Sequence, residues 1–440
     1  MFKKIDKLFE KALFKRIELW FLLLILIIFW IVSILAFKSY ENPNNKIFHF
    51  SKIFVNAPIN FLNLVSTSLE QENAVATITT KKSLITNIKK SHLKESSLKV
   101  FNGEPTITGR DDIYDSEFRI PLQIDNYFFI INPNNNTFKK YKVPSIVKAY
   151  SEFDDTVIVA VNEGPEDSTS QLKKVDSNGM ILWSIKINSH HSLHIDSNGY
   201  IYTATINNDY DGPPSKINMY DGKIYRDDGF AVISPDGKVL FEKSVSELMI
   251  DNKLGVYIYG VGAFERDPIH LNNVKPILKD TEVFKKGDLI LSLRHQSMLI
   301  AYRPSTDKIV WYQVGPWMNQ HDPDILEDGK ISVFGNDVVS SYKNRTLEDA
   351  ILINGQNEVY VFNPLNNSYV TPFSKKIKNT ELNTITGGLH KIYQDGSIAI
   401  HFSNMGILAY FSSKDDIVNY YYIESSGGID RKSNTATLLR

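Results

Sequence analysis

Short apolar or alternating runs recur along the chain from about residue 100 onward, and Asp-Gly, Asn-Gly and Asn-Pro turn signals separate them. Five stretches follow the pattern of a strand, a tight turn and a second strand: 173–187, 193–205, 231–245, 324–336 and 390–402. A glycine stands in each turn, where a positive φ angle is needed. No long amphipathic helix pattern appears in this part of the chain, so we expect an all-β domain.

The turns form a loose repeat. Gly179 and Gly237 lie in similar hairpins roughly 60 residues apart, and Gly329 and Gly396 have a comparable separation. A region of this length holds about six such units, and repeated four-stranded units close as a β-propeller. The sequence therefore predicts a six-bladed β-propeller over residues 101–440, with a β-sandwich pair as the competing architecture.

The N-terminal part has a different texture. Residues 19–37 form an uncharged apolar run, long enough to span a bilayer, and residues 1–18 before it are rich in lysine. By the positive-inside rule we expect a cytoplasmic flank, a transmembrane signal anchor and export of everything that follows. Residues 38–100 are interpreted as a membrane-proximal connector. A cleaved signal peptide is the alternative, although its apolar region would be shorter and would end in small residues.

Composition narrows the classes of function. The chain has 49 basic and 50 acidic residues, so a generic nucleic-acid binder is disfavoured. It has no cysteine, which removes disulfides, thiolate nucleophiles and Cys-bound metal centres. Phosphate-binding loops, nucleophile elbows and dinucleotide-binding glycine motifs are also absent.

The histidines are the candidate chemistry. His191 and His321 stand at the same offset before a turn glycine, which places both just before an inner strand of a propeller. His270 precedes another strand region, Arg294 lies in an apolar strand, and His390 occupies a similar but shifted place. A buried arginine requires an anion or a carboxylate, so these residues could surround an anion.

Two alternatives compete with that interpretation. Single histidines are commonly solvated loop residues or satisfied core residues. His190, His191 and His194 could also chelate a metal locally, but the spacing typical of histidine metal sites is missing.

The stretch 287–337, with Arg294 in SLRHQS, a strand ending VWYQVG, and QHD before a turn, resembles the bacterial arylsulfate sulfotransferases. DPIHLNNV, HHSLHIDSNGYIY and GGLHKIYQDGSIAIHFSNMGILAYF resemble further segments of that family, and the likeness covers about residues 150–415. The resemblance implies an exported six-bladed propeller with its active site at a central channel.

The resemblance also implies site residues. His321 matches the nucleophilic histidine that carries a transient sulfuryl group, and Arg294, His270 and His191 match the residues that surround the sulfate. Protonated His191 or His270 could act as general acid. Three departures stand out: Phe334–Asp337 reads FGND rather than FDNG, the segment 275–290 is longer, and a disulfide found in some members is absent.

The expected function is transfer of a sulfuryl group from an aryl sulfate donor to a phenolic acceptor, with no cofactor, metal or nucleic acid. The expected location is a single-pass membrane anchor with the catalytic domain on the periplasmic side, and a homodimer is left open. The alternative is a non-catalytic anchored propeller that binds an anionic ligand or a protein partner. A channel blocked by Trp317 would favour that alternative.

Overall fold

The computed structural model describes Ile27 and residues 93–95, 97–101, 104–108, 114–124, 126–143, 145, 147–162, 170–207, 226–260, 267–340, 350–414 and 418–422. The chain divides into two compact units, Met1–Ile85 and Thr86–Arg440. All described strands belong to the second unit. The predicted anchor at 19–37 falls outside the described residues except for Ile27. No described helix is both long and apolar enough to cross a membrane.

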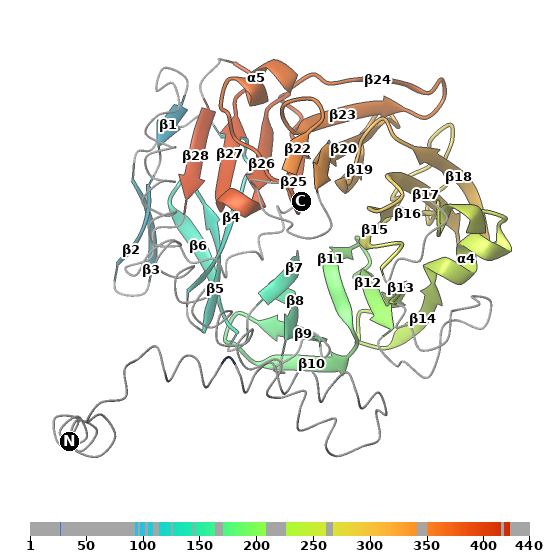
Figure 1. The fold of residues 1–440 in the computed structure, drawn as a ribbon. Helices are drawn as coiled ribbons and strands as arrows, with labels where there is room; N and C mark the ends of the chain where they lie inside the picture. Colours follow the sequence, from blue (N-terminus) through green and yellow to red (C-terminus); the bar gives the residue numbers. More distant parts are fainter. Residues whose placement is uncertain are drawn as a thin grey trace. The chain divides into compact units, whose positions relative to one another are not determined.

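Six antiparallel sheets follow one another around a ring in the second unit, so the prediction of a six-bladed propeller is confirmed (Figure 1). Blades 1 to 3 contain, from the inner strand outward, β4 (Ile120–Ile124), β5 (Tyr127–Asn132) and β6 (Thr137–Lys142); β7 (Val147–Phe153), β8 (Thr156–Asn162), β9 (Ser170–Asp176) and β10 (Ile181–Lys186); and β11 (Ser189–Ile195), β12 (Ile201–Asn207), β13 (Asp227–Ile233) and β14 (Val239–Ser244).

Blades 4 to 6 complete the ring. They contain β15 (Leu271–Pro276), β16 (Leu289–Leu293), β17 (Met298–Arg303) and β18 (Lys308–Val314); β19 (His321–Ile325), β20 (Ile331–Gly335), β23 (Glu358–Asn363) and β24 (Ser368–Val370); and β25 (Leu389–Ile392), β26 (Ile398–Phe402), β27 (Ile407–Phe411) and β28 (Val418–Tyr422).

Short elements lie outside the four-stranded pattern. They are β1 (Leu93–Glu95), the hairpins β2 (Ser97–Phe101) with β3 (Glu104–Thr108) and β21 (Val338–Ser340) with β22 (Ala350–Leu352), the helices α4 (Val245–Asp251) and α5 (Ser374–Lys378), and the 3₁₀ turns η1 (Gly255–Tyr257) and η2 (Ser403–Met405). β1 pairs in parallel with β28 at the outer edge of blade 6. This strand comes from the segment that the sequence assigned to a connector.

All five predicted hairpins are present, and their turn glycines have φ angles between 79° and 83°. Two of the turns share the sequence Asp-Ser-Asn-Gly. In each, the aspartate Oδ1 accepts backbone N–H bonds from the residues two and four positions later, as Asp176 does from Asn178 and Met180. Gly179 and Gly237 both join the third and fourth strands of a blade, and Gly329 and Gly396 both join the first and second. Each of the two glycine pairs in the repeat therefore marks the same turn in two different blades.

The core lies between the blades. Middle strands such as β16 and β17 are buried along almost their whole length, whereas the outer strand β18 alternates exposed and half-buried positions. Apolar clusters join successive faces, and one of them packs Ile120 and Phe129 of blade 1 against Leu408 and Tyr410 of blade 6. That cluster closes the ring by hydrophobic burial.

Side-chain acceptors on one blade also hold the backbone at the inner strand of the next. Asp228 of blade 3 accepts the N–H of His270 at 2.9 Å, and Asn273 of blade 4 accepts the N–H of Asp322 at 2.9 Å. Asp322 in turn accepts the N–H of His390 at 2.8 Å. His270 and Asp322 have left-handed φ angles of 52° and 49°. These bonds stabilise a backbone conformation that is costly for residues other than glycine.

Candidate functional site

His321 begins β19 of blade 5 and is buried. Its Nδ1 lies 2.7 Å from Oδ1 of Asn336. The Asn336 amide nitrogen donates to the carbonyls of Thr384 at 3.0 Å and Gly387 at 2.8 Å, which fixes its orientation. Since Oδ1 can only accept, Nδ1 of His321 carries the hydrogen. A neutral ring held in this way has its lone pair on Nε2, the atom that a nucleophile requires.

The surroundings of His321 keep the ring neutral. Burial lowers its pKa to about 3, and the neighbouring Arg294 and His270 add to that effect. The Asn336 side chain and the Asn319 backbone favour the protonated ring but are outweighed. At neutral pH His321 is therefore an unprotonated imidazole beside a permanent positive charge.

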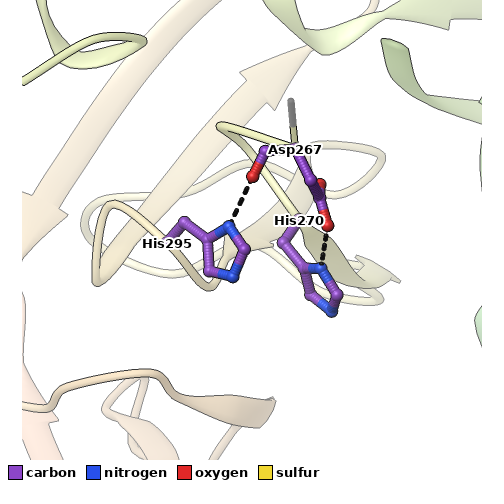
Figure 2. Close-up of side chains that lie close together, drawn as sticks. All are labelled: Asp267, His270 and His295. Atoms are coloured by element: carbon purple, nitrogen blue, oxygen red, sulfur yellow. Dashed lines mark hydrogen bonds and ion pairs between the residues drawn. The ribbon is translucent and has the colours of Figure 1, made fainter. Parts of the chain in front are cut away.

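Blade 4 supplies His270, Arg294 and two residues that hold them. Figure 2 shows His270 and His295 on either side of Asp267. His270 Nδ1 lies 2.6 Å from the Asp267 carboxylate, and His295 Nδ1 lies 2.5 Å from the Asp267 backbone carbonyl. Because a carbonyl only accepts, His295 Nδ1 is protonated.

This tautomer of His295 determines how Arg294 is held. Arg294 directly follows β16, and its Nη1 donates to Nε2 of His295 at 2.9 Å. Burial, together with the neighbouring His270, lowers the pKa of His295 to about 4, so the ring stays neutral and can accept. The Arg294 backbone N–H also bonds to the His270 carbonyl at 3.1 Å. His270 and Arg294 are thus tied together at one end of blade 4.

Three histidines of β11 bring blade 3 to the same place. The His191 ring centroid lies 5.0 Å from that of His270 and 4.5 Å from that of His190. His191 is exposed, whereas His194 is buried. Crowding by protein atoms lowers the pKa of His191 well below its usual value, and His190, His270 and His321 act in the same direction. Solvent reaches this ring, so water offsets part of the desolvation.

His191 and His321 both lie near the start of the inner strand of a blade, but their shared offset does not correspond to a shared register. His321 starts β19 and pairs with Phe334, the fourth residue of β20. In blade 3 the fourth residue of β12 is Ala204, and it pairs with His190. The β-bulge in β11 holds one more inserted residue than the β-bulge in β19. His191 is therefore out of register with His321. Among the three histidines of β11, His191 is nonetheless the exposed one, and its ring lies next to that of His270.

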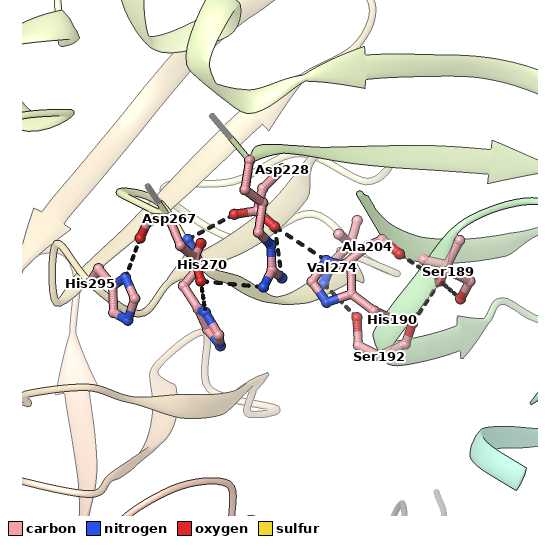
Figure 3. A network of polar contacts seen from close by, with 11 residues as sticks. Ser189, His190, Ser192, Ala204, Asp228, Asp267, His270, Val274 and His295 are labelled. Carbon is pink, nitrogen blue, oxygen red and sulfur yellow. Dashed lines mark hydrogen bonds and ion pairs between the residues drawn. The ribbon is translucent and has the colours of Figure 1, made fainter. Parts of the chain in front are cut away.

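Asp228 connects blades 3 and 4 behind these rings (Figure 3). Its fully buried carboxylate lies 3.2 Å from His190 Nε2 and 3.2 Å from Arg226 Nη2, in addition to its bond from the His270 N–H. Arg226 also reaches Asp267 at 3.3 Å. The charges of Arg226 and Arg294 balance those of Asp228 and Asp267, so this cluster carries no net charge when its histidines are neutral.

Among the described residues, the grouping of metal-ligand types is Asp267, His270 and His295, and it does not include the His190–His194 stretch. In this group the Asp267 oxygen already accepts from His270 and lies 3.3 Å from Arg226. An arginine at that distance opposes a cation electrostatically. The geometry fits an anion site better than a metal site.

Other sequence expectations have clear outcomes. Trp317 is buried between blades 4 and 5 against Tyr360 and Phe362, so it does not block the site. His390 is buried and bonds to Ser332 at 2.9 Å. The long segment 275–290 packs Phe284 into the same core as Trp317.

The structure therefore places His191, His270, Arg294 and His321 near one another on blades 3, 4 and 5, and their roles stay a prediction. The sequence reasoning missed the residues that hold them: Arg226, Asp228, Asp267, His295 and Asn336. Three of these had a signal, because Asp267 begins DPIH, His295 follows Arg294, and Asn336 lies in the altered FGND segment. Asp228 had none, since its partners lie in other strands.

A family model for arylsulfotransferases (ASST) matches residues 165–422. No curated protein matches the chain.

Among solved structures, a protein of unknown function from Bacteroides caccae is 12% identical, with a TM-score of 0.42, over 70% of this chain and 100% of its own. A virginiamycin B lyase from Staphylococcus aureus is 9% identical, with a TM-score of 0.39, over 78% of this chain and 88% of its own. These are distant likenesses that assign no activity here.

Proposed function

Because the chain belongs to the arylsulfotransferase family, we propose that it transfers a sulfuryl group from a phenolic sulfate ester to a phenolic acceptor through a sulfohistidine on His321. The observation that carries this proposal is the neutral His321 ring with Nδ1–H held by Asn336, beside Arg294 and His270. A neutral imidazole nitrogen can attack sulfur, and no nucleotide donor is required.

The neighbouring groups would stabilise the transferring group. The planar fork of Arg294 matches two sulfate oxygens and is held in orientation by His295. His191 and His270 stand beside it from blades 3 and 4. Preorganised donors of this kind stabilise negative charge that develops on a transferring group.

The test uses the purified full-length protein with 4-nitrophenyl sulfate as donor and phenol as acceptor. We expect nitrophenolate release that depends on the acceptor, and a sulfuryl adduct on the His321 peptide in mass spectra of protein quenched with donor alone. His321→Asn should abolish both. Full turnover by His321→Asn would refute the assignment. Tight binding of an aryl sulfate by the wild type, without turnover, would favour a binding propeller.

The location is part of the proposal. The apolar run 19–37 and its basic flank support an uncleaved anchor with the propeller exported. A phosphatase reporter that is active only outside the cytoplasm, fused after residue 38, should be active. A reporter active only in the cytoplasm should be silent at the same position.

A further inference from the structure

The segment that follows β20 carries a buried carboxylate which the proposed chemistry does not use. Asp337 is fully buried and has a left-handed φ angle of 52°. Its Oδ1 accepts the backbone N–H of Met318 at 2.8 Å. Its Oδ2 accepts from the Tyr360 hydroxyl at 2.8 Å and from the Asn354 amide at 3.3 Å. All three donors are neutral groups, and a carboxylate that is buried among neutral donors costs free energy.

The pKa of Asp337 reflects that cost. Burial raises this pKa to about 6, and the carboxylate of Glu358 acts in the same direction. The bonds from Met318, Tyr360 and Asn354 favour the ionised form but are outweighed. Above about pH 7 the side chain is therefore charged in a place that opposes its charge. A buried group that is kept in this way is a candidate for a role in function.

Asp337 joins the two segments that hold the proposed nucleophile. Met318 lies three residues before His321 in the chain, and its carbonyl accepts the N–H of Asp337 at 2.9 Å, so two hydrogen bonds link Met318 to Asp337. Asn336, directly before Asp337, accepts from Nδ1 of His321. The bond between His321 and Asn336 thus closes a small ring of contacts, and Asp337 lies opposite that bond in the ring.

The loop before His321 is also held from blade 4. The Gln320 side chain donates to Ser292 and to two backbone carbonyls of that blade. The Asn319 side chain donates to the Val338 carbonyl at 2.7 Å, next to Asp337. Gln320 therefore sets the loop against blade 4, whereas Asp337 and Val338 set it against the segment that carries Asn336.

Gly335 leaves the space that this carboxylate fills. A Cβ atom at Gly335 would lie 2.7 Å from Oδ1 of Asp337 and 2.7 Å from Cε2 of Tyr360. The order FGND in place of FDNG therefore has a physical reason, because glycine at 335 makes room for aspartate at 337. An aspartate at 335 would direct its own carboxylate towards the same space.

We propose that Asp337 is a positioning residue for sulfuryl transfer. Its carboxylate fixes the backbone of Met318, and thereby holds His321 against the Asn336 oxygen that keeps the ring hydrogen on Nδ1. The lone pair then stays on Nε2, where the nucleophile needs it. The effect on catalysis rests on the proposed function, but the tautomer of His321 can be tested without turnover.

The kinetic test uses Asp337→Gly in the full-length protein. This change removes the carboxylate without straining the backbone, because a φ angle of 52° suits glycine. At about pH 8, saturating 4-nitrophenyl sulfate should form the sulfuryl adduct roughly 10- to 100-fold more slowly than in the wild type, with little change in KM.

Nitrogen NMR of protein labelled at histidine reports the tautomer of His321 directly. The wild type should carry the hydrogen on Nδ1, and Asp337→Gly should show a mixture of tautomers; His321→Asn identifies the signals by their loss. The control is Asp288→Ala, which removes another buried carboxylate that accepts a backbone N–H, at the end of β16 away from Arg294. It should lower stability and leave the tautomer and the rate as in the wild type.

The exchanged positions provide a second test. Gly335→Asp alone should slow adduct formation, since its Cβ would overlap Asp337 and Tyr360. Gly335→Asp combined with Asp337→Gly returns a carboxylate to the same space and should recover most of the rate that Asp337→Gly loses.

An unchanged tautomer or an unchanged rate in Asp337→Gly would overturn the inference, and so would a double variant no faster than Asp337→Gly. If Asp337→Gly does not fold, the double variant decides. It should fold with the hydrogen of His321 on Nδ1, and its failure to do so would also overturn the inference. A wild type that turns over no aryl sulfate would refute the proposed function, whereas the comparison of tautomers would still decide the role of Asp337.

Discussion

Asn336 accepts a hydrogen bond from His321 at 2.7 Å while its amide nitrogen bonds to two backbone carbonyls, so the tautomer of His321 is set by a side chain that cannot turn over. Flipping the amide would place its N–H₂ against the ring and its oxygen against both carbonyls. The proposed nucleophile therefore owes the lone pair on its Nε2 to a neighbouring asparagine.

Asn336→Asp should change the pH dependence of transfer. A carboxylate beside Nδ1 favours the imidazolium, so the pKa of His321 should rise from its low value by about one to three units. Protonation removes the nucleophile, and the acidic limb of the kcat/KM profile should move to higher pH by a similar amount. Asn198→Asp, in an exposed turn, is the control and should leave the limb in place. An unmoved limb in Asn336→Asp would contradict the tautomer argument.

His295→Ala should weaken the hold on Arg294. A hydrogen bond from a charged donor contributes about 1.5–3 kcal/mol, so kcat/KM for the donor should fall roughly 10- to 100-fold. His295→Gln can supply an oxygen acceptor and should recover part of the loss. Steady-state kinetics with both variants provides the measurement, and identical losses would show that His295 acts only through packing.

Asp228→Asn should destabilise the propeller itself. The carboxylate is fully buried between His190, Arg226 and the His270 N–H, and removing one partner of a buried ion pair costs about 3–5 kcal/mol. Denaturant unfolding of the purified protein should show a lower midpoint. Asp328→Asn, which breaks the exposed pair with Lys330, should change the free energy of unfolding by less than about 1 kcal/mol. Similar effects of the two substitutions would disprove the role of Asp228.

His401 should make the free energy of unfolding depend on pH. Burial on β26 lowers its pKa to about 4, below the value of about 6.5 expected in the unfolded chain. The unfolded state then takes up a proton first as the pH falls, so stability is complete above about 6.5 and is lost towards 4. Between pH 7.5 and 5, His401→Gln should reduce the loss in free energy of unfolding by about 2 kcal/mol, measured by denaturant titration. An unchanged loss would mean that the pKa of His401 is the same in the folded and the unfolded chain.

The propeller could be predicted from the sequence because a glycine marks each tight turn that needs a positive φ angle. Gly179 and Gly237 each need a positive φ angle at the same place in a blade, and that need survives in a degenerate repeat. The candidate histidines were chosen for their places before predicted strands, and Arg294 was chosen for its charge in an apolar strand. The choice of His191 by its offset illustrates the limit, because one extra residue in β11 changed the register.

The supporting residues could not be read in the same way. Asp228 acts on His190, Arg226 and the backbone of His270, which come from different strands and a different blade. Such partnerships depend on how blades stack, and no local pattern encodes them. Asn336 lies in a segment that departs from the family pattern, and only the backbone carbonyls of blade 6 show why an asparagine suits that place.

The parallel pairing of β1 with β28 has a consequence for synthesis. Leu93 is made early and Val418 late, so the outer edge of blade 6 stays incomplete until almost the whole propeller has been translated. Until then β1 presents unpaired backbone groups to its surroundings. A chain that ends before Val418 would leave β1 without its partner at the edge of blade 6. Blade 6 therefore gains its fifth strand only after the segment around Val418 has been made, although β1 is among the first described parts of the chain.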